Sequence, residues 1–174
     1  TRSGYGAHAR DLALELIKAD KYDLRIASLR WGNTPMNALN EQNPDHKLIL
    51  DRMIYEGMLD KQPDLHIQVT VPNEFQPMGT SFNIGVSAGI ETTINPPDFI
   101  EGMNRMDLNL VSSKHSKQVA MTTTFEKSNK KNPEAREVIK LEKPCEILFE
   151  GLDLNTYFKI QKPKSIILKD IPEF

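Results

Sequence analysis

The chain has 174 residues, of which 39% are hydrophobic and 26% charged, and its formal net charge is −2 at pH 7. These values are typical of a soluble globular domain with a core of its own. They exclude a global basic field that would attract nucleic acid. One local basic run, KSNKK at 127–131, lies in a polar stretch, where we expect a solvated loop and no nucleic-acid partner.

Cys145 is the only cysteine, which excludes a disulfide within the chain, and its apolar neighbours predict a small buried side chain. No apolar segment approaches the roughly 18 residues that a membrane span needs, and no leader pattern opens the chain. We therefore expect a cytoplasmic protein without a membrane span. The four histidines have no metal-ligand spacing, so no metal site is predicted.

The chain begins with Gly4 and Gly6 on either side of Tyr5, a pattern that allows a tight turn with exposed amide groups. Apolar residues among charged ones then predict an amphipathic helix over 7–19, whose positive end would point at that turn. Such a turn normally follows a β-strand, and none precedes it. Either a first strand is missing, or the glycines only make the end of the chain flexible.

The rest of the chain alternates between strand and helix patterns. Strands are predicted at 24–29, 65–71, 82–88, 107–113 and 145–151, and helices at 45–59, 96–106 and 114–125. Within the polar stretch 126–143 the segment 134–141 has a helical pattern, and 154–158 resembles one helical turn. This order predicts an α/β fold: a Rossmann-like, mostly parallel sheet with helices on both faces.

Ligands of open α/β sheets bind beyond the carboxyl ends of the strands, so polar residues there are candidates. Asn73 and Glu74 follow one predicted strand, and Glu91 follows the next. Each glutamate is either a turn residue or a carboxylate that accepts a proton from a hydroxyl group, and we take both as candidate catalytic bases. Glu150 and Gly151 end the last predicted strand and belong to the same group of loops.

Ser113 is expected to cap the helix at 114–125, and the exposed amides of that helix could also hold a phosphate or sugar oxygen. His115, in the first turn, is expected to be solvated. Trp31 is expected to be buried, with stacking on a sugar ring as the alternative. Nicotinamide binding is disfavoured, because Arg30 stands where a dinucleotide site needs an acidic residue.

Three segments resemble glycosyltransferases of the GT-B fold, which have two Rossmann-like domains. The first segment, SGYGAHARDLALEL, resembles the glycine-rich loop and first helix of these enzymes. The second, NLVSSKHSKQVA, resembles a strand of family-4-type enzymes that ends in Ser-x-x-Ser-Lys. The third, ILFEGLDLNTYF, is similar to the segment that leads into their interdomain linker. The stretch VPNEFQP…NIGVSAGIETT is similar to a divergent branch from tailed bacteriophages and marine environmental sequences. The resemblance spans most of residues 2–158.

This resemblance implies an N-terminal, acceptor-side domain over 1–158 and, over 159–174, a linker towards a C-terminal donor-binding domain. It places Gly4, Tyr5 and Gly6 near the phosphates of a nucleotide-sugar donor, with no other cofactor. It places Ser113 and its neighbours, His115 among them, along the interdomain cleft. Glu150 and Gly151 match the Asn-Gly at the approach to the linker, with Glu150 in place of Asn, and are further candidate substrate-binding residues. Asn73 and Glu74 stand where many relatives have a His-containing loop, so the base remains open between Glu74 and Glu91.

Two further functions remain open from the sequence. One is a non-catalytic sugar- or nucleotide-binding module in a larger assembly, and the other is a nucleotide-dependent enzyme of another class on the same fold. A chain that lacks its first strand and second domain would leave strand edges unpaired, so we expect it to dimerise or to be poorly soluble. The sequence names neither the donor, nor the acceptor, nor the stereochemical outcome.

Overall fold

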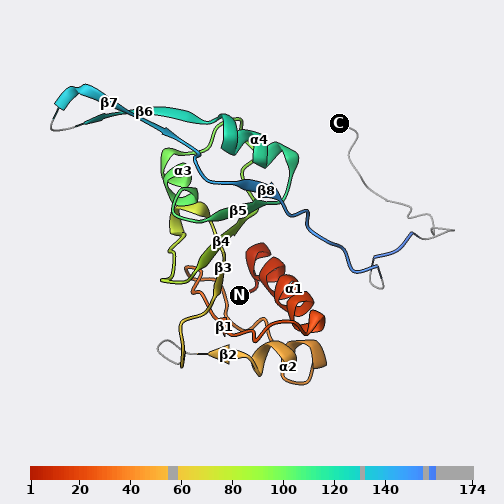
Figure 1. Cartoon of the computed structure of the whole chain (residues 1–174). Coiled ribbons are helices and arrows are strands. Elements are labelled where there is room, and N and C mark those ends of the chain that lie inside the picture. The colour runs from red at the N-terminus through yellow and green to blue at the C-terminus, as the bar shows by residue number, and fades with distance from the viewer. Residues whose placement is uncertain (55–58, 130–131, 155–156, 160–174) are drawn as a thin grey trace, which may run out of the picture.

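The main body is a four-stranded parallel sheet with helices on both sides. The computed structural model describes residues 1–54, 59–129, 132–154 and 157–159. The sheet order is β3-β4-β5-β8, and its strands are β3 (Leu65–Val69), β4 (Phe82–Ser87), β5 (Leu108–Val111) and β8 (Cys145–Ile147). The predicted α/β class with a mostly parallel, Rossmann-like sheet is confirmed (Figure 1).

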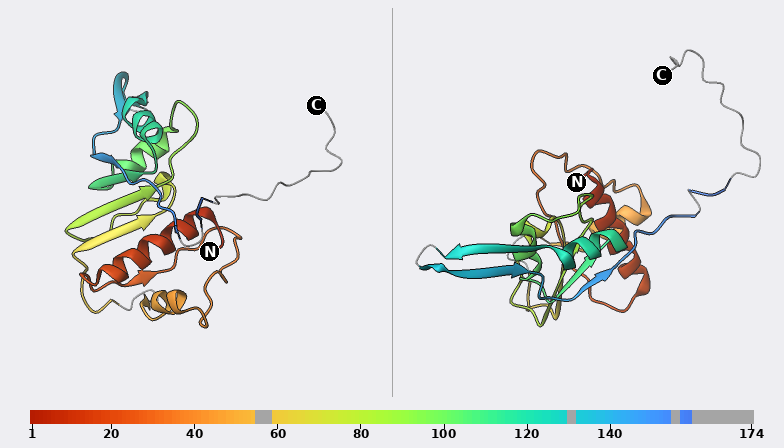
Figure 2. Two further views of the ribbon diagram at one scale, coloured as in Figure 1. Left: turned by 90° about the vertical axis from the view of Figure 1, so that its right-hand side faces the viewer. Right: turned by 90° about the horizontal axis from the view of Figure 1, so that it is seen from above.

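The helices lie on opposite sides of this sheet. In Figures 1 and 2, α3 is on one side of β3 and β4 and α1 is on the other. The bounds are α1 (Gly4–Ala19), α2 (Pro44–Leu50), α3 (Pro97–Met103) and α4 (Lys114–Thr122), with a short 3₁₀ helix, η1 (Pro72–Glu74), after β3. α1 packs against α2 and β3, whereas α4 packs against β8. The predicted arrangement of helices on both faces is therefore present.

Two small sheets accompany the main one. β1 (Ile26–Ala27) and β2 (Met53–Ile54) form a parallel pair, much shorter than the strand predicted at 24–29. β6 (Thr124–Asn129) and β7 (Asn132–Lys140) form an antiparallel hairpin that extends away from the body in Figure 2. Lys127 lies in β6, so the solvated loop predicted at 127–131 is wrong there, and 130–131 lie outside the described residues.

The helix predicted at 134–141 is wrong, because the segment is strand β7. Among its described side chains Ile139 is buried, at 9% exposed, and its neighbour Val138 points the other way, at 52% exposed. Ile139 pairs across the hairpin with Phe125, which packs against the main core. Pairing with β6 and the burial of Ile139 have outweighed the helix-forming tendency of the charged residues in this segment.

The helix predicted at 45–59 is also wrong in its second half. α2 ends at Leu50, and after two intervening residues β2 begins and pairs with β1. The backbone N–H of Ile26 donates to the carbonyl of Arg52 at 2.9 Å, which extends this pairing by one residue. Residues 55–58 lie outside the described residues, as do 155–156 of the turn predicted at 154–158 and most of the predicted linker.

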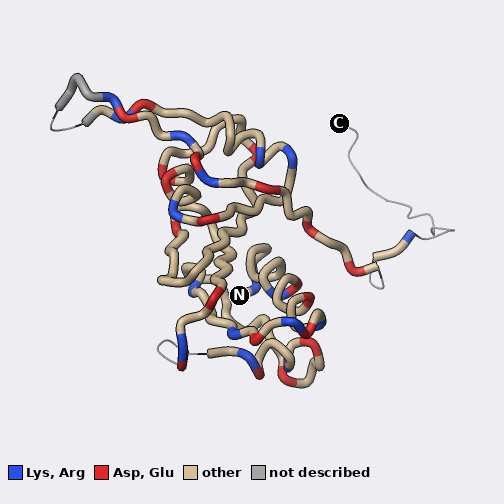
Figure 3. The backbone as a smooth tube through the Cα atoms, in the orientation of Figure 1, with Lys and Arg blue, Asp and Glu red and all other residues tan. Residues whose placement is uncertain are grey.

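The buried core lies almost entirely in the main sheet and its helices. Its members are Phe75, Ile100, Met103, Met106, Val111, Ala120, Ile139 and Cys145. The burial predicted for Cys145 is confirmed. Among residues 1–54 only Ile49 is buried, and α1 has no buried residue although its sequence is amphipathic. Basic and acidic residues are interspersed along the chain in Figure 3.

The contact between α3 and η1 provides a test of the packing. A Cβ atom at Gly102 would overlap the carbonyl oxygen of Pro72, so this helix can approach only with glycine at that position. We expect Gly102→Ala to lower the free energy of unfolding by about 1–3 kcal/mol, as overpacked core substitutions do. Urea denaturation measures it. Gly4→Ala, whose new methyl group would meet open space, is the matched control, and equal stability of the two variants would contradict the packing.

His66 makes stability depend on pH. Burial lowers the pKa of this imidazole below its ordinary value, and its hydrogen-bond contact with Asn83 only partly opposes the effect. The unfolded chain therefore binds the proton more readily than the folded one. We expect the free energy of unfolding to fall as the pH decreases from about 6.5 towards the lower pKa of the folded state. Urea midpoints across this range should lose that slope in His66→Asn and keep it in His115→Gln.

Candidate functional site

The start of α1 lies against the carboxyl end of β4. Ser3 is the N-cap of this helix, and its hydroxyl accepts the backbone N–H of Gly6 at 3.0 Å. The turn predicted at Gly4 and Gly6 is therefore wrong: both glycines belong to the first turns of the helix, and neither has a positive φ. Gly6 is required for a different reason, because a Cβ there would overlap Thr1.

Tyr5 connects α1 to the end of β4. Its hydroxyl lies 3.1 Å from the Ser87 hydroxyl and accepts the backbone N–H of Ala88 at 3.2 Å. Its ring stacks on Trp31, with centroids 5.0 Å apart and planes at 27°. Trp31 is therefore half-buried against another aromatic ring. From the sequence we predict burial, with stacking on a sugar ring as the alternative, and the observed state lies between the two.

α4 holds the same segment from the other side. The hydroxyls of Ser112 and Ser116 donate to the carbonyl of Ala88 at 2.7 and 3.3 Å. Gly89 follows with φ +88°, and a Cβ at this position would also overlap Ser116. Residues 87–89 are thus fixed between the N-termini of two helices, and only glycine fits the turn.

Ser113 is the N-cap of α4, as predicted. Its hydroxyl accepts the backbone N–H of Ser116 at 3.0 Å and lies 2.9 Å from the Ser116 hydroxyl. His115 is exposed but not merely solvated, because its Nε2 lies 3.1 Å from the carbonyl of Thr92 and so ties the loop after β4 to α4. His115 therefore contacts the loop after β4, and Ser113 is linked to that segment only through Ser116, whose hydroxyl reaches Ala88.

Glu150 reaches the same edge from the segment after β8. Its Oε1 lies 3.5 Å from Nδ1 of His8, which is one helical turn beyond Tyr5 in α1. Gly151 beside it is exposed. From the sequence we assess His8 only for metal-ligand spacing, together with the other three histidines. Its spacing of three residues from Tyr5, which places both on one helix face, is the signal that could have identified it.

The two glutamates predicted as bases are not joined to this cluster. The Oε2 of Glu74, in η1, accepts the Thr70 hydroxyl at 2.6 Å, and the carbonyl of Asn73 accepts Nη2 of Arg105 at 2.8 Å. Within the described ranges, no hydrogen bond or ion pair connects Asn73 or Glu74 with Tyr5, Ser113 or Glu150. Glu91 is exposed in the loop after Gly89 and makes no such contact in the same ranges.

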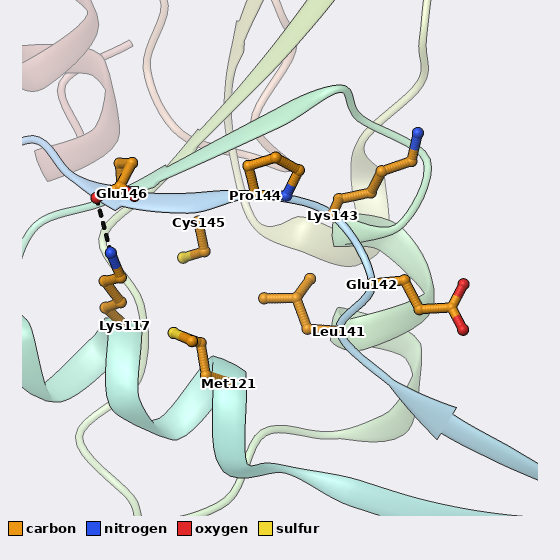
Figure 4. Close-up of a pocket in the computed structure, with 8 residues that line it drawn as sticks. All are labelled: Lys117, Met121, Leu141, Glu142, Lys143, Pro144, Cys145 and Glu146. Atoms are coloured by element: carbon orange, nitrogen blue, oxygen red, sulfur yellow. Dashed lines mark hydrogen bonds and ion pairs between the residues drawn. The ribbon is translucent and has the colours of Figure 1, made fainter.

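A hollow of about 400 Å³ lies apart from these residues, between α4 and the segment 141–146. Cys145, Met121 and Leu141 face one another across it, and an ion pair of 2.7 Å joins Lys117 and Glu146 at its side (Figure 4). Burial raises the pKa of the Cys145 thiol to about 11. The thiol therefore stays protonated at neutral pH and is a poor nucleophile.

In the part of the chain that the structure describes, no three His, Cys, Asp or Glu side chains gather as metal ligands would. No described helix combines the length and apolarity needed to cross a bilayer. Comparison with protein-family models, with curated proteins and with solved structures gives no match.

We call Tyr5, His8, Ser87, Ser113 and Glu150 the rim cluster. Tyr5 contacts Ser87, His8 of the same helix faces Glu150, and Ser113 is linked to Ala88 through Ser116, so the group combines hydroxyls, an imidazole and a carboxylate. Hydroxyls and amides of this kind can orient a sugar or phosphate oxygen, and an imidazole beside a carboxylate can take a proton from a hydroxyl. Of the residues predicted at strand ends, Tyr5 contacts the end of β4, His115 contacts the loop after β4, Glu150 contacts α1, and Ser113 bonds within its own helix.

Removal of the Tyr5 hydroxyl tests the link between α1 and β4. Tyr5→Phe leaves the backbone N–H of Ala88 without its acceptor, so we expect a loss of about 0.5–1.5 kcal/mol in the free energy of unfolding. Tyr22→Phe is the matched control, because Tyr22 is 60% exposed. Thermal and urea unfolding measure both. If the two variants unfold alike, the hydroxyl does not hold the helix to the sheet.

Proposed function

We propose that this chain is the N-terminal, acceptor-side domain of a glycosyltransferase of GT-B fold, acting with a nucleotide-sugar donor when joined to its C-terminal domain. The observation that supports the proposal is a chain of contacts: Tyr5 and His8 of α1 reach the segments beyond β4 and β8, and Ser112 beyond β5 bonds to Ala88 beyond β4. This is the edge at which open α/β sheets bind ligands. The sequence resemblance supplies the reaction class.

The reaction would be displacement at the anomeric carbon, with a nucleoside diphosphate as leaving group. The acceptor hydroxyl must lose a proton, and the leaving diphosphate gains negative charge. The N-terminus of α1 would supply a positive dipole end and the backbone amides of Gly4 and Tyr5 for that charge, whereas the Gly6 amide is taken by the Ser3 cap. Ser113, the cap of α4, would orient a sugar hydroxyl.

His8 is the base that the rim cluster favours. Its Nδ1 faces Glu150 at 3.5 Å, so a proton on Nδ1 leaves Nε2 free to accept the proton of the acceptor. Glu150 would hold that tautomer and stabilise the imidazolium that forms. Glu74 and Glu91 remain the bases predicted from the sequence, and they would act from outside the rim cluster.

A non-catalytic sugar- or nucleotide-binding module is the second candidate. It is favoured by the way the polar groups of the edge already satisfy one another: Tyr5 with Ser87, Ser113 with Ser116, and Ser112 with Ala88. Polar groups that already form hydrogen bonds with one another can bind a ligand at the surface, and this binding requires no proton transfer. This candidate predicts ligand binding and no turnover.

The activity test uses a protein that contains this chain followed by its C-terminal domain. We expect His8→Gln to lower kcat about 10²–10⁴-fold, because a positioned general base contributes that much. Release of nucleoside diphosphate from a panel of nucleotide-sugars measures turnover. His46→Gln, a histidine of α2 outside the rim cluster, is the matched control and should retain full activity.

Two other results would decide against this assignment. Loss of turnover in Glu74→Gln or Glu91→Gln, with His8→Gln active, would return the base to the glutamates. A rise in melting temperature with nucleoside diphosphates or sugars, without turnover of any donor, would favour the binding module, because ligands that bind the native state stabilise it.

A further inference from the structure

A second hollow, of about 430 Å³, lies directly after β1. We call it the β1 pocket, and its lining residues are Ser28, Arg30, Gly32, Asn33, Thr34 and Met36. It belongs to the loop that connects β1 with α2 and that carries Trp31, the ring stacked on Tyr5. The pocket therefore adjoins the start of α1 without sharing a lining residue with the rim cluster.

The lining is basic and rich in hydrogen-bond donors. Arg30 is its only charged member, and Ser28, Asn33 and Thr34 carry hydroxyl or amide groups. In the described part of the chain none of these four side chains makes a hydrogen bond or an ion pair. A guanidinium group without a carboxylate partner, among neutral donors, is a suitable environment for a phosphoryl group, whose oxygens its planar fork fits.

The backbone of the pocket is held in one shape. The N–H of Thr34 donates to the carbonyl of Trp31 at 2.9 Å and closes a turn in which Gly32 has φ +49°. The N–H groups of Gly32 and Asn33, at the tip of this turn, donate to no protein atom in the described ranges. Consecutive free backbone N–H groups in a turn are a recurrent element of anion sites.

Contacts with the start of α1 bring further positive charge to the loop. The backbone N–H of Arg2 donates to the carbonyl of Pro35 at 3.2 Å, and the Arg2 guanidinium reaches the carbonyl of Asn37 at 3.5 Å. Arg2 directly precedes Ser3, the N-cap of the helix, where the dipole is positive. The loop thus lies beside a second arginine and a helix N-terminus.

From these observations we infer that the β1 pocket binds the phosphoryl group of a small phosphate compound, with Arg30 as its charged contact and Thr34 and Ser28 as neutral donors. The chemistry is shared by inorganic phosphate and by phosphate monoesters of sugars. The inference does not depend on glycosyl transfer: loss of turnover in His8→Gln says nothing of this pocket, and failure of phosphate to bind leaves the transferase proposal intact.

Trp31 provides the measurement, because it is the only tryptophan of the chain and stands between two lining residues. We would titrate the protein with inorganic phosphate, glucose 6-phosphate and ribose 5-phosphate, and follow tryptophan fluorescence against NaCl at matched ionic strength. A saturable change with phosphate that NaCl does not produce is the expected result. Tighter binding of one monoester identifies that sugar phosphate as the better ligand, and equal affinities identify the phosphoryl group alone.

Arg30→Gln should weaken phosphate binding at least about tenfold, the usual loss when a charged hydrogen-bond donor is removed. Arg25→Gln is the matched control, since Arg25 is an exposed arginine paired with Asp23 at 2.9 Å outside the pocket, and it should bind phosphate as the unchanged protein does. Thr34→Val keeps the charge and the shape, and should weaken binding about two- to tenfold.

Two results would overturn the inference. The first is the absence of a saturable change beyond that of NaCl, with no phosphate-induced rise in melting temperature. The second is an equal affinity for phosphate in the unchanged protein, Arg30→Gln and Thr34→Val. Far-UV circular dichroism of each variant confirms that the comparison is made between folded proteins.

Discussion

The relative placement of α1, α4 and the main sheet depends on the hydrogen bonds that both helices make to residues 87–89, at the end of β4. Tyr5 holds the segment from α1, and the serines at the start of α4 hold it through the carbonyl of Ala88. Gly89 allows the approach, because any side chain there would overlap Ser116. A few hydrogen bonds at one strand end therefore position groups that lie more than 80 residues apart in the chain.

These polar contacts matter because apolar packing is distributed unevenly. The core gathers around Phe75, Ile100 and Met106 in the main sheet, whereas α1 contributes no buried residue and residues 1–54 contribute only Ile49. Hydrophobic burial is the main source of stability in a domain. The N-terminal segment is therefore attached to the main sheet largely by polar contacts, those of the Tyr5 hydroxyl with residues 87–88 and the His8–Glu150 pair.

Both proposed sites lie next to the start of α1. The rim cluster forms where α1 meets the ends of the main strands, and the β1 pocket forms where α1 meets the loop after β1. Tyr5 contributes to both neighbourhoods, because its hydroxyl bonds to Ser87 and its ring stacks on Trp31.

The sequence was sufficient to predict those helices and strands that depend only on neighbouring residues. The alternation at 65–71 and 82–88 and the cap at Ser113 correspond to β3, β4 and α4, because strand periodicity and capping depend on neighbouring residues. The segment 45–59 was predicted as a helix from its apolar spacing, and 134–141 lies in a charged stretch with a helical pattern. Pairing with β1 and with β6 instead made strands of Met53–Ile54 and Asn132–Lys140.

The sequence by itself determined the α/β class, the order of most elements, the buried Cys145 and the polar strand ends that could gather. Only the tertiary structure decided which of those residues meet. It brought His8 beside Glu150 and Tyr5 beside Ser87, and it left Glu74 with Thr70 and Glu91 exposed. The physical reason is that periodicity and turn chemistry act over a few residues, whereas contacts between α1 and the strand ends depend on how the whole chain closes.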